Sequence, residues 1–118
     1  MEFSIRRIYD DAGTGEGRRV LVDRLWPRGK SRAELEGIPW LKSIAPSDGL
    51  RHWFDHEPAK WPEFKRRYFA ELDANPEGLA ELRKVLGHGR HATLLYAAKD
   101  EEHNNAVALA EYLRNHPL

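Results

Sequence analysis

The chain has 118 residues, of which 41% are hydrophobic and 32% are charged, with 19 acidic and 19 basic side chains. This length is typical of one domain with its own core, and the balanced charge gives no overall field toward nucleic acid or membranes. The sequence contains no cysteine, which excludes disulfides, thiolate nucleophiles and cysteine-ligated zinc or iron–sulfur sites.

The N-terminus lacks a signal-peptide core, and no apolar stretch approaches the length of a membrane span. We therefore expect a cytoplasmic, soluble protein whose residues 1–118 form one domain without membrane contact. The charge is locally uneven, however. Six cations and one acid lie between Arg18 and Arg32, a balance of +5, whereas four acids and no cation lie between Glu71 and Glu81, a balance of −4.

Two strands are predicted in the N-terminal region. Phe3 to Tyr9 alternates apolar and polar side chains, which is typical of a half-exposed strand. Residues 10–17 carry three glycines, but a phosphate-binding loop would lead into a helix, and a strand follows here. We interpret this segment as a mobile connection. Val20 to Val22 is continuously apolar, which favours a central parallel strand that is buried on both faces.

Helical patterns occupy the middle of the chain. Pro39 is expected to begin a short helical turn, and Ser47 is a good N-cap for a second helix. From Trp61 to Leu72, apolar residues recur every three or four positions and predict one apolar helix face. Asn75 followed by proline predicts the start of another helix, which Gly87 or the glycine two residues later can end.

The C-terminal region predicts a strand followed by a helix. Ala92 to Ala98 is the second nearly continuous apolar run, and Asp100 is expected to cap the final helix. Two buried strands that are joined through helices pair in parallel. The predicted fold class is therefore α/β, with a small, mainly parallel sheet and crossover helices packed on it in a single compact domain.

The carboxyl ends of parallel strands meet at one sheet edge, where open α/β sheets bind ligands. We expect a small anionic partner there, because the rigid fork of arginine suits carboxylate and phosphate groups. The alternative is structural: Asp23 forms an ion pair that closes the sheet edge, and the tryptophan after the strand packs in the core. The candidate ligand-binding residues are Arg24, Trp26, Arg28, Lys99 and Asn104.

Two residues are candidates for catalysis. Asp23 could act as a base or orient an arginine, and His103, in the expected first turn of the last helix, would have its cationic form disfavoured. A solvated surface histidine is the alternative for His103. His52 and His56 have the spacing of one helix face, but no third ligand accompanies them at a diagnostic spacing. We predict no metal site and no cofactor, and whether the protein is an enzyme stays open.

Four segments resemble the YeaO-like family, a branch of the bacterial class called domain of unknown function 488. The resemblance covers nearly the whole chain and implies a compact α/β domain, without an established activity. The family pattern usually reads Asn-His-Ala at the last helix, where this chain has Asn104-Asn105-Ala106, so we assign no role to Asn105. Sulfur transfer, as in rhodanese-like branches, is excluded because cysteine is absent. The segments are Val20-Leu21-Val22-Asp23-Arg24-Leu25-Trp26-Pro27-Arg28-Gly29, Trp40 to Ser47, Leu50 to Phe54 and Leu94 to Asp100.

Three functions follow from these observations. The first is binding of a phosphate- or carboxylate-bearing metabolite at the strand ends. The second is a nucleic-acid binding module that uses residues 18–32 and the Lys65-Arg66-Arg67 cluster, against which the neutral overall charge counts. The third is an interaction domain without chemistry. The oligomeric state stays open.

Overall fold

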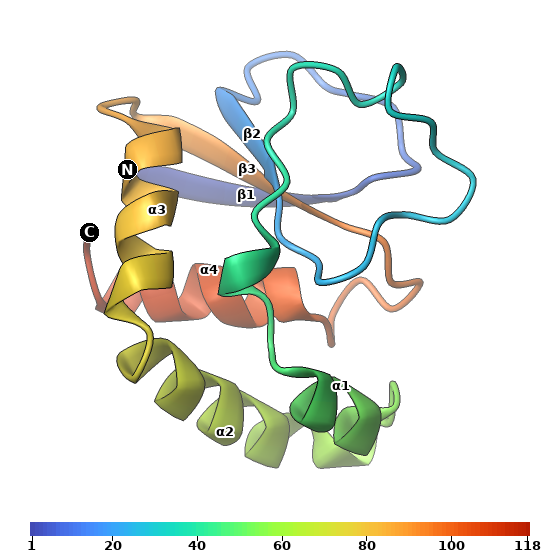
Figure 1. Cartoon of the computed structure of the whole chain (residues 1–118), viewed down its shortest axis with the longest axis vertical. Coiled ribbons are helices and arrows are strands. Elements are labelled where there is room, and N and C mark those ends of the chain that lie inside the picture. Colours follow the sequence, from blue (N-terminus) through green and yellow to red (C-terminus); the bar gives the residue numbers. More distant parts are fainter.

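A three-stranded parallel sheet forms the centre of the structure (Figure 1). The computed structural model describes all residues from 1 to 118, with strands β1 (Glu2–Arg7), β2 (Arg18–Leu21) and β3 (His91–Tyr96). The strand order is β1-β3-β2, and β3 pairs in parallel with both neighbours. The predicted α/β class and the parallel pairing of the two apolar strands are confirmed.

The middle strand is β3, so the predicted central position of Val20 to Val22 is wrong. This run is fully buried although β2 lies at one side of the sheet. A non-strand segment covers its outer edge: the Leu21 amide donates to the Pro39 carbonyl and the Leu41 amide donates to the Leu21 carbonyl, both at 2.9 Å. That cover, in place of a fourth strand, explains why the run from Val20 to Val22 is apolar and buried.

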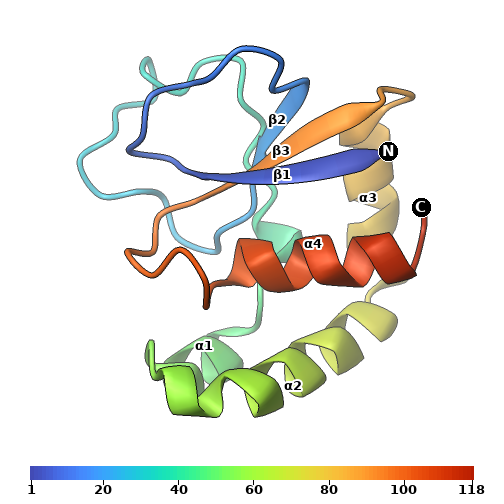
Figure 2. The same ribbon diagram turned by 180° about the vertical axis from the view of Figure 1, so that it is seen from behind.

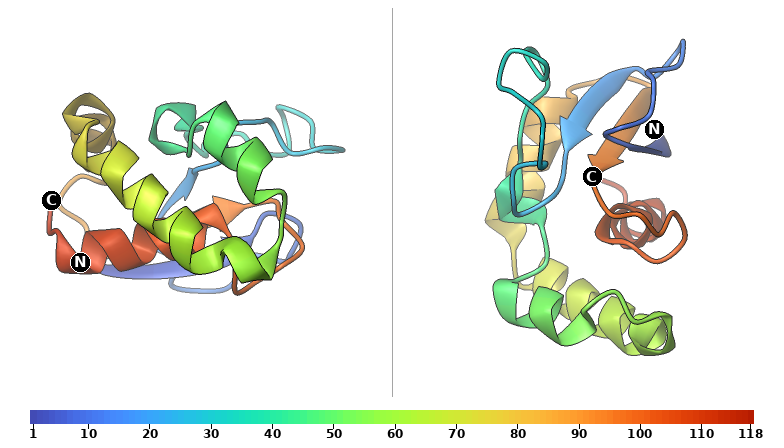
Figure 3. Two further views of the ribbon diagram at one scale, coloured as in Figure 1. Left: turned by 90° about the horizontal axis from the view of Figure 1, so that it is seen from below. Right: turned by 90° about the vertical axis from the view of Figure 1, so that its right-hand side faces the viewer.

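The chain forms four α-helices, which lie beside and below the sheet in Figure 2. Helix α4 packs against β1 and β3, while α2 contacts α1, α3 and α4. The side view in Figure 3 shows α3 and α4 on opposite sides of the sheet, with α1 and α2 beneath it. None of these helices combines the length and the apolar composition that a membrane crossing requires. The elements are α1 (Asp48–Phe54), α2 (Trp61–Asp73), α3 (Pro76–Leu86), α4 (Asn105–Asn115) and the short 3-10 turns η1 (Lys42–Ile44) and η2 (Pro58–Lys60).

Three helix boundaries lie where the sequence predicts them. The Ser47 hydroxyl accepts a hydrogen bond from the Leu50 amide at 3.2 Å and caps α1. The Asn75 side chain accepts one from the Gly78 amide at 3.0 Å and caps α3. Helix α3 ends at Gly87, whose φ of 62° is accessible to glycine at little cost.

The predicted start of the last helix is wrong. Asn104, with an extended backbone, is the N-cap of α4 and accepts a hydrogen bond from the Val107 amide at 3.0 Å. Asp100 instead closes a separate turn, in which one carboxylate oxygen accepts from the amides of Glu102 and His103 at 2.9 and 3.0 Å. His103 therefore precedes the helix and does not belong to its first turn.

The glycine-containing segment before β2 is tied to β3 over its last residues. The Gly15 carbonyl lies 2.6 Å from Nδ1 of His91, and the Glu16 carbonyl accepts from the Thr93 hydroxyl at 2.8 Å. Gly17 has a φ of 66°, and a Cβ there would lie 2.1 Å from the His91 carbonyl oxygen. These contacts hold the second half of the segment in place, in contrast to the mobile connection that we predicted.

Candidate functional site

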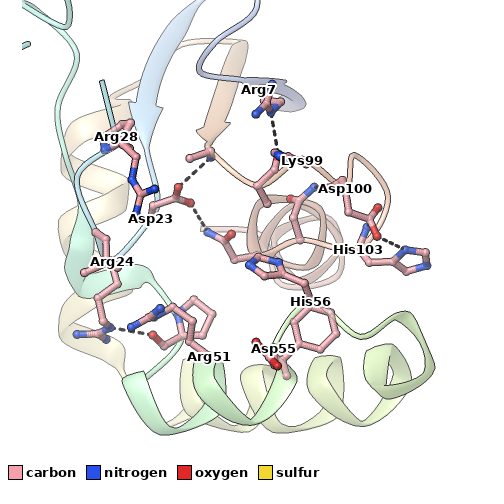
Figure 4. A pocket seen from close by; sticks show the side chains of 18 of the residues that line it. Arg7, Asp23, Arg24, Arg28, Arg51, Asp55, His56, Lys99, Asp100 and His103 are labelled. Carbon is pink, nitrogen blue, oxygen red and sulfur yellow. Dashed lines mark hydrogen bonds and ion pairs between the residues drawn. The ribbon is translucent and has the colours of Figure 1, made fainter. Parts of the chain in front are cut away.

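A cavity of about 930 Å³ opens at the carboxyl ends of β2 and β3 (Figure 4). Its lining residues come from these strand ends, from the end of β1 and the residues after it, from the segment after β2, from α1 and α2, and from the loop before α4 and the first residue of α4. The structure thus brings all the residues singled out for binding or catalysis around one cavity. They are Asp23, Arg24, Trp26, Arg28, Lys99, His103 and Asn104.

Asp23 lines this cavity and is the second residue after the end of β2. Its Oδ2 accepts a hydrogen bond from the Ala97 amide at 2.9 Å, and its Oδ1 accepts one from Nδ2 of Asn105 at 2.9 Å. Burial raises the pKa of Asp23 above its usual range, although these two hydrogen bonds act in the opposite direction. No cation lies within ion-pair distance of the carboxylate, so an Asp23 ion pair that closes the sheet edge is not formed.

Asn105 is the residue that the sequence reasoning missed. Its Nδ2 donates both to Oδ1 of Asp23 at 2.9 Å and to the Val22 carbonyl at 3.0 Å, which links α4 to the end of β2. The only signal in the sequence was the departure from the family pattern at this position. The Asn105 carboxamide does not ionise near neutral pH, so it can position Asp23 but cannot serve as a base.

Two of the predicted ligand-binding side chains are engaged within the chain. The Nε of Arg24 donates to the Pro46 carbonyl at 2.9 Å and lies 3.8 Å from Oδ1 of Asp48. Asn104 is buried, with its Nδ2 donating to the Asp100 carbonyl at 2.9 Å and its Oδ1 capping α4. These two residues therefore hold the surrounding segments in place.

Trp26 lies among other side chains at the edge of the cavity. Its Nε1 donates to the Lys30 carbonyl at 2.7 Å, and its ring meets the Trp40 ring edge-on at a centroid distance of 5.3 Å. The Arg32 guanidinium lies 4.1 Å from the Trp26 ring centroid. The ring thus packs within the protein and lines the cavity at the same time.

Arg28 and Lys99 are different, because their charged groups are free. Both residues are exposed, both line the cavity, and neither side chain makes a hydrogen bond or an ion pair. Their backbones are nevertheless fixed: the Tyr9 hydroxyl donates to the Arg28 carbonyl at 2.7 Å, and Nε of Arg7 donates to the Ala98 carbonyl at 3.0 Å. Figure 4 shows the Arg28 guanidinium reaching toward the side of the cavity where Asp23 lies.

His103 is paired with the loop that carries it. Its Nδ1 lies 2.9 Å from Oδ2 of Asp100, and its ring meets the Trp61 ring edge-on at 5.4 Å. Hydrogen bonds from the Glu102 amide and from His103 lower the pKa of Asp100. Figure 4 places His103 and Asp23 on opposite sides of the cavity, so the two catalytic candidates do not face one reacting atom.

His52 and His56 do not share a helix face. Helix α1 ends at Phe54, and Asp55 and His56 take left-handed backbone conformations with φ of 46° and 55°. Both histidines line the cavity, but no group of three or more His, Cys, Asp or Glu side chains is placed to hold a metal ion.

The basic stretch of residues 18–32 is divided between the two ends of β2. Its first two arginines lie at the start of the strand, whereas Arg28 lies beyond the strand's end and lines the cavity. Lys30 lies 3.8 Å from the Glu34 carboxylate, and Arg32 is stacked on Trp26. The six cations therefore do not form one continuous binding surface.

Comparison with known proteins decides the family. Residues 2–117 match the family model described as the inactive DUF488-N3 subclade. The chain belongs to the DUF488 family. It is 39% identical over 118 residues to the uncharacterized protein YeaO of Escherichia coli strain K12, an alignment that covers 98% of this chain and 99% of the relative.

Two further relatives come from mycobacteria. The chain is 38% identical over 109 residues to the uncharacterized proteins Rv3073c of Mycobacterium tuberculosis strain H37Rv and Mb3100c of Mycobacterium bovis. Each alignment covers 92% of this DUF488 chain and 91% of the relative. The YeaO-like resemblance of the sequence is thereby confirmed. No solved structure matches the chain significantly.

Proposed function

We propose that this DUF488 protein binds a small phosphate- or carboxylate-bearing anion at the carboxyl ends of its strands, in the cytoplasm, without transforming it chemically. The observation that carries the proposal is the pair of unpartnered cations, Arg28 and Lys99, on one cavity. Charge-assisted hydrogen bonds from such groups to an anion are among the stronger polar interactions in proteins.

The remaining charges of the cavity favour an anion as well. The lining contains five Lys or Arg side chains and three Asp, a formal balance of +2 with neutral histidines. Both carboxylate oxygens of Asp23 already accept hydrogen bonds from nitrogen, and so do both oxygens of Asp100. The acids are therefore largely used within the protein, whereas two of the cations are not.

Three observations favour binding over catalysis. No serine, threonine or cysteine lines the cavity, and its one tyrosine hydroxyl, that of Tyr9, is engaged as a donor to the Arg28 carbonyl. Asp23 is hydrogen-bonded to an amide side chain that cannot relay a proton. The matching family model is itself described as inactive. A binding role accounts for the free cations without requiring a reaction.

A thermal-shift screen tests the proposal. The panel contains phosphate, sulfate, dicarboxylates, sugar phosphates and nucleotides, added to the wild type and to the variants Arg28→Ala, Lys99→Ala and Arg19→Ala. A ligand at one hundred times its Kd stabilises the fold by about 2.7 kcal/mol, which raises Tm by several degrees. Arg19→Ala is the matched control, because Arg19 is an exposed arginine at the opposite end of β2.

We expect an anion-dependent shift in the wild type and in Arg19→Ala that the other two variants lose. A shift that all four proteins share equally would place the anion elsewhere and contradict the proposal. If no anion raises Tm, the two alternative functions gain support. They are a nucleic-acid binding module, recognisable by binding that weakens steeply with salt, and a non-catalytic interaction domain.

A further inference from the structure

Large hydrophobic side chains are exposed at only four positions, and two of these border the cavity. Met1 and Leu118 are the terminal residues, whereas Tyr9 and Leu25 line the proposed anion site. A single exposed apolar residue needs no explanation on a protein surface. Here two exposed apolar residues lie at the same cavity as the two free cations, which suggests that all four serve one ligand.

The exposure of Leu25 is imposed by its neighbours. Leu25 is 57% exposed, although the side chains of both adjacent residues are anchored. Arg24 donates to the Pro46 carbonyl at 2.9 Å, and Trp26 donates to the Lys30 carbonyl at 2.7 Å. The backbone on either side is thus fixed, and Leu25 stays at the cavity edge instead of turning into the core.

Tyr9 is fixed beside the cationic group in a similar way. Its hydroxyl donates to the Arg28 carbonyl at 2.7 Å, so the ring lies next to the residue that carries the free guanidinium. The Arg7 guanidinium lies 4.7 Å from the centroid of the same ring, and Tyr9 as a residue is 37% exposed. An apolar surface and a free positive charge are therefore adjacent at one edge of the cavity.

From this arrangement we infer that the ligand is an amphipathic anion, with a phosphate or carboxylate group joined to an aromatic or branched aliphatic body. The inference rests on the proposed function and specifies its ligand class. The anionic group binds Arg28 and Lys99, and the apolar body contacts Leu25 and Tyr9. A cavity of about 930 Å³ lies in the size range of sites for small organic molecules and far exceeds the volume of an inorganic anion.

Isothermal titration calorimetry with two probes separates this inference from the proposed function. Phenyl phosphate carries both parts of the expected ligand, and inorganic phosphate carries only the anionic one. The proteins are the wild type, Leu25→Ser, Arg28→Ala and the control Leu118→Ser, which alters an exposed leucine away from this cavity. Both leucine substitutions affect exposed side chains, so the fold should be retained.

We expect phenyl phosphate to bind the wild type about tenfold more tightly than inorganic phosphate, as the burial of roughly 60 Å² of apolar surface would give. The preference should be lost in Leu25→Ser and kept in Leu118→Ser, while Arg28→Ala weakens both probes. Equal affinities for the two probes in the wild type, or a preference that survives Leu25→Ser, would overturn the inference and leave the proposed function standing. If neither probe binds, the inference fails, and the anion panel of the thermal-shift screen decides whether the proposed function fails with it.

Discussion

The side-chain amide of Asn105 donates to Oδ1 of Asp23 at 2.9 Å, so the first residue of α4 is joined to the second residue after β2. The same nitrogen donates to the Val22 carbonyl at 3.0 Å. The position of α4 therefore fixes both the end of the strand and the orientation of the carboxylate. Asp23 and Asn105 are 82 residues apart in the chain, so this hydrogen bond is a long-range contact between the N-terminal and the C-terminal parts of the protein.

Replacing Asn105 with alanine should destabilise the protein by about 1–3 kcal/mol, because a desolvated carboxylate and a strand-end carbonyl lose their shared donor. Urea unfolding measures the difference. Asn115→Ala is the control: Asn115 is an exposed residue of the same helix, and we expect its loss to cost less than about 0.5 kcal/mol. Similar losses in the two variants would show that the contact with Asp23 contributes little.

The pKa of Asp23 should be measurably above its ordinary value of 3.8, because burial disfavours the carboxylate form. Carbon-13 NMR of the side-chain carboxyl group measures it directly. In Asn105→Ala the pKa should rise further, because a hydrogen bond that stabilises the charged form is removed. A value at or below 3.8 in the wild type would contradict the burial argument.

The raised pKa of Asp23 also predicts how the stability of the protein changes with pH. A native pKa above the unfolded one means that the contribution of Asp23 is fully present below about pH 3.8 and is lost as pH rises through the native pKa. The free energy of unfolding of the wild type minus that of Asp23→Asn should therefore decrease as pH is raised from that range to neutrality. An increase over this range would be the opposite of what we predict.

Arg24 and Arg28 should differ in their effects on stability. Arg24→Ala removes the hydrogen bond to the Pro46 carbonyl and should cost about 0.5–1.5 kcal/mol. Arg28→Ala removes a side chain without partners and should change the free energy of unfolding by less than about 0.5 kcal/mol. Urea unfolding in a buffer without phosphate, sulfate or carboxylates tests both. A large loss in Arg28→Ala would mean that its side chain is structural, which would remove the main support for the anion site.

Gly17→Ala should be strongly destabilising, by about 2 kcal/mol or more, because a Cβ would strike the His91 carbonyl oxygen in a left-handed backbone conformation. Gly13→Ala is the matched control, since nothing lies within 4 Å of a Cβ there. Thermal unfolding of the two variants makes the comparison. Equal melting temperatures would show that the segment before β2 moves easily away from β3.

Local sequence signals predicted much of this fold. Ser47 and Asn75 were recognised as helix caps because the chemistry of an N-cap lies within three residues of the chain. The predicted start of α4 was wrong because Asp100 and Asn104, four positions apart, are both good N-cap residue types. Which of them caps the helix depends on how the loop leaves β3, and this is decided by packing.

The cavity was predicted better than the roles of its residues. Parallel strands place their ends together, so the collection of Asp23, Arg28 and Lys99 followed from topology. The sequence could not predict which of these cations stay without a partner. Arg24 binds a backbone carbonyl, and because every residue has such a group, no sequence pattern marks the partner. Asn105 was missed for a related reason: its partner lies 82 positions away, beyond any local pattern.

The central position of β3 determines when, during synthesis of the chain, the sheet can form. Strands β1 and β2 precede it in the chain, yet each pairs with β3 and not with the other. A growing polypeptide that has not yet reached residue 91 has no partner for either strand, so the sheet must wait until the ribosome has released most of the chain. Folding of this protein is thus expected to be largely post-translational, with the last strand synthesised completing the pairing of both earlier ones.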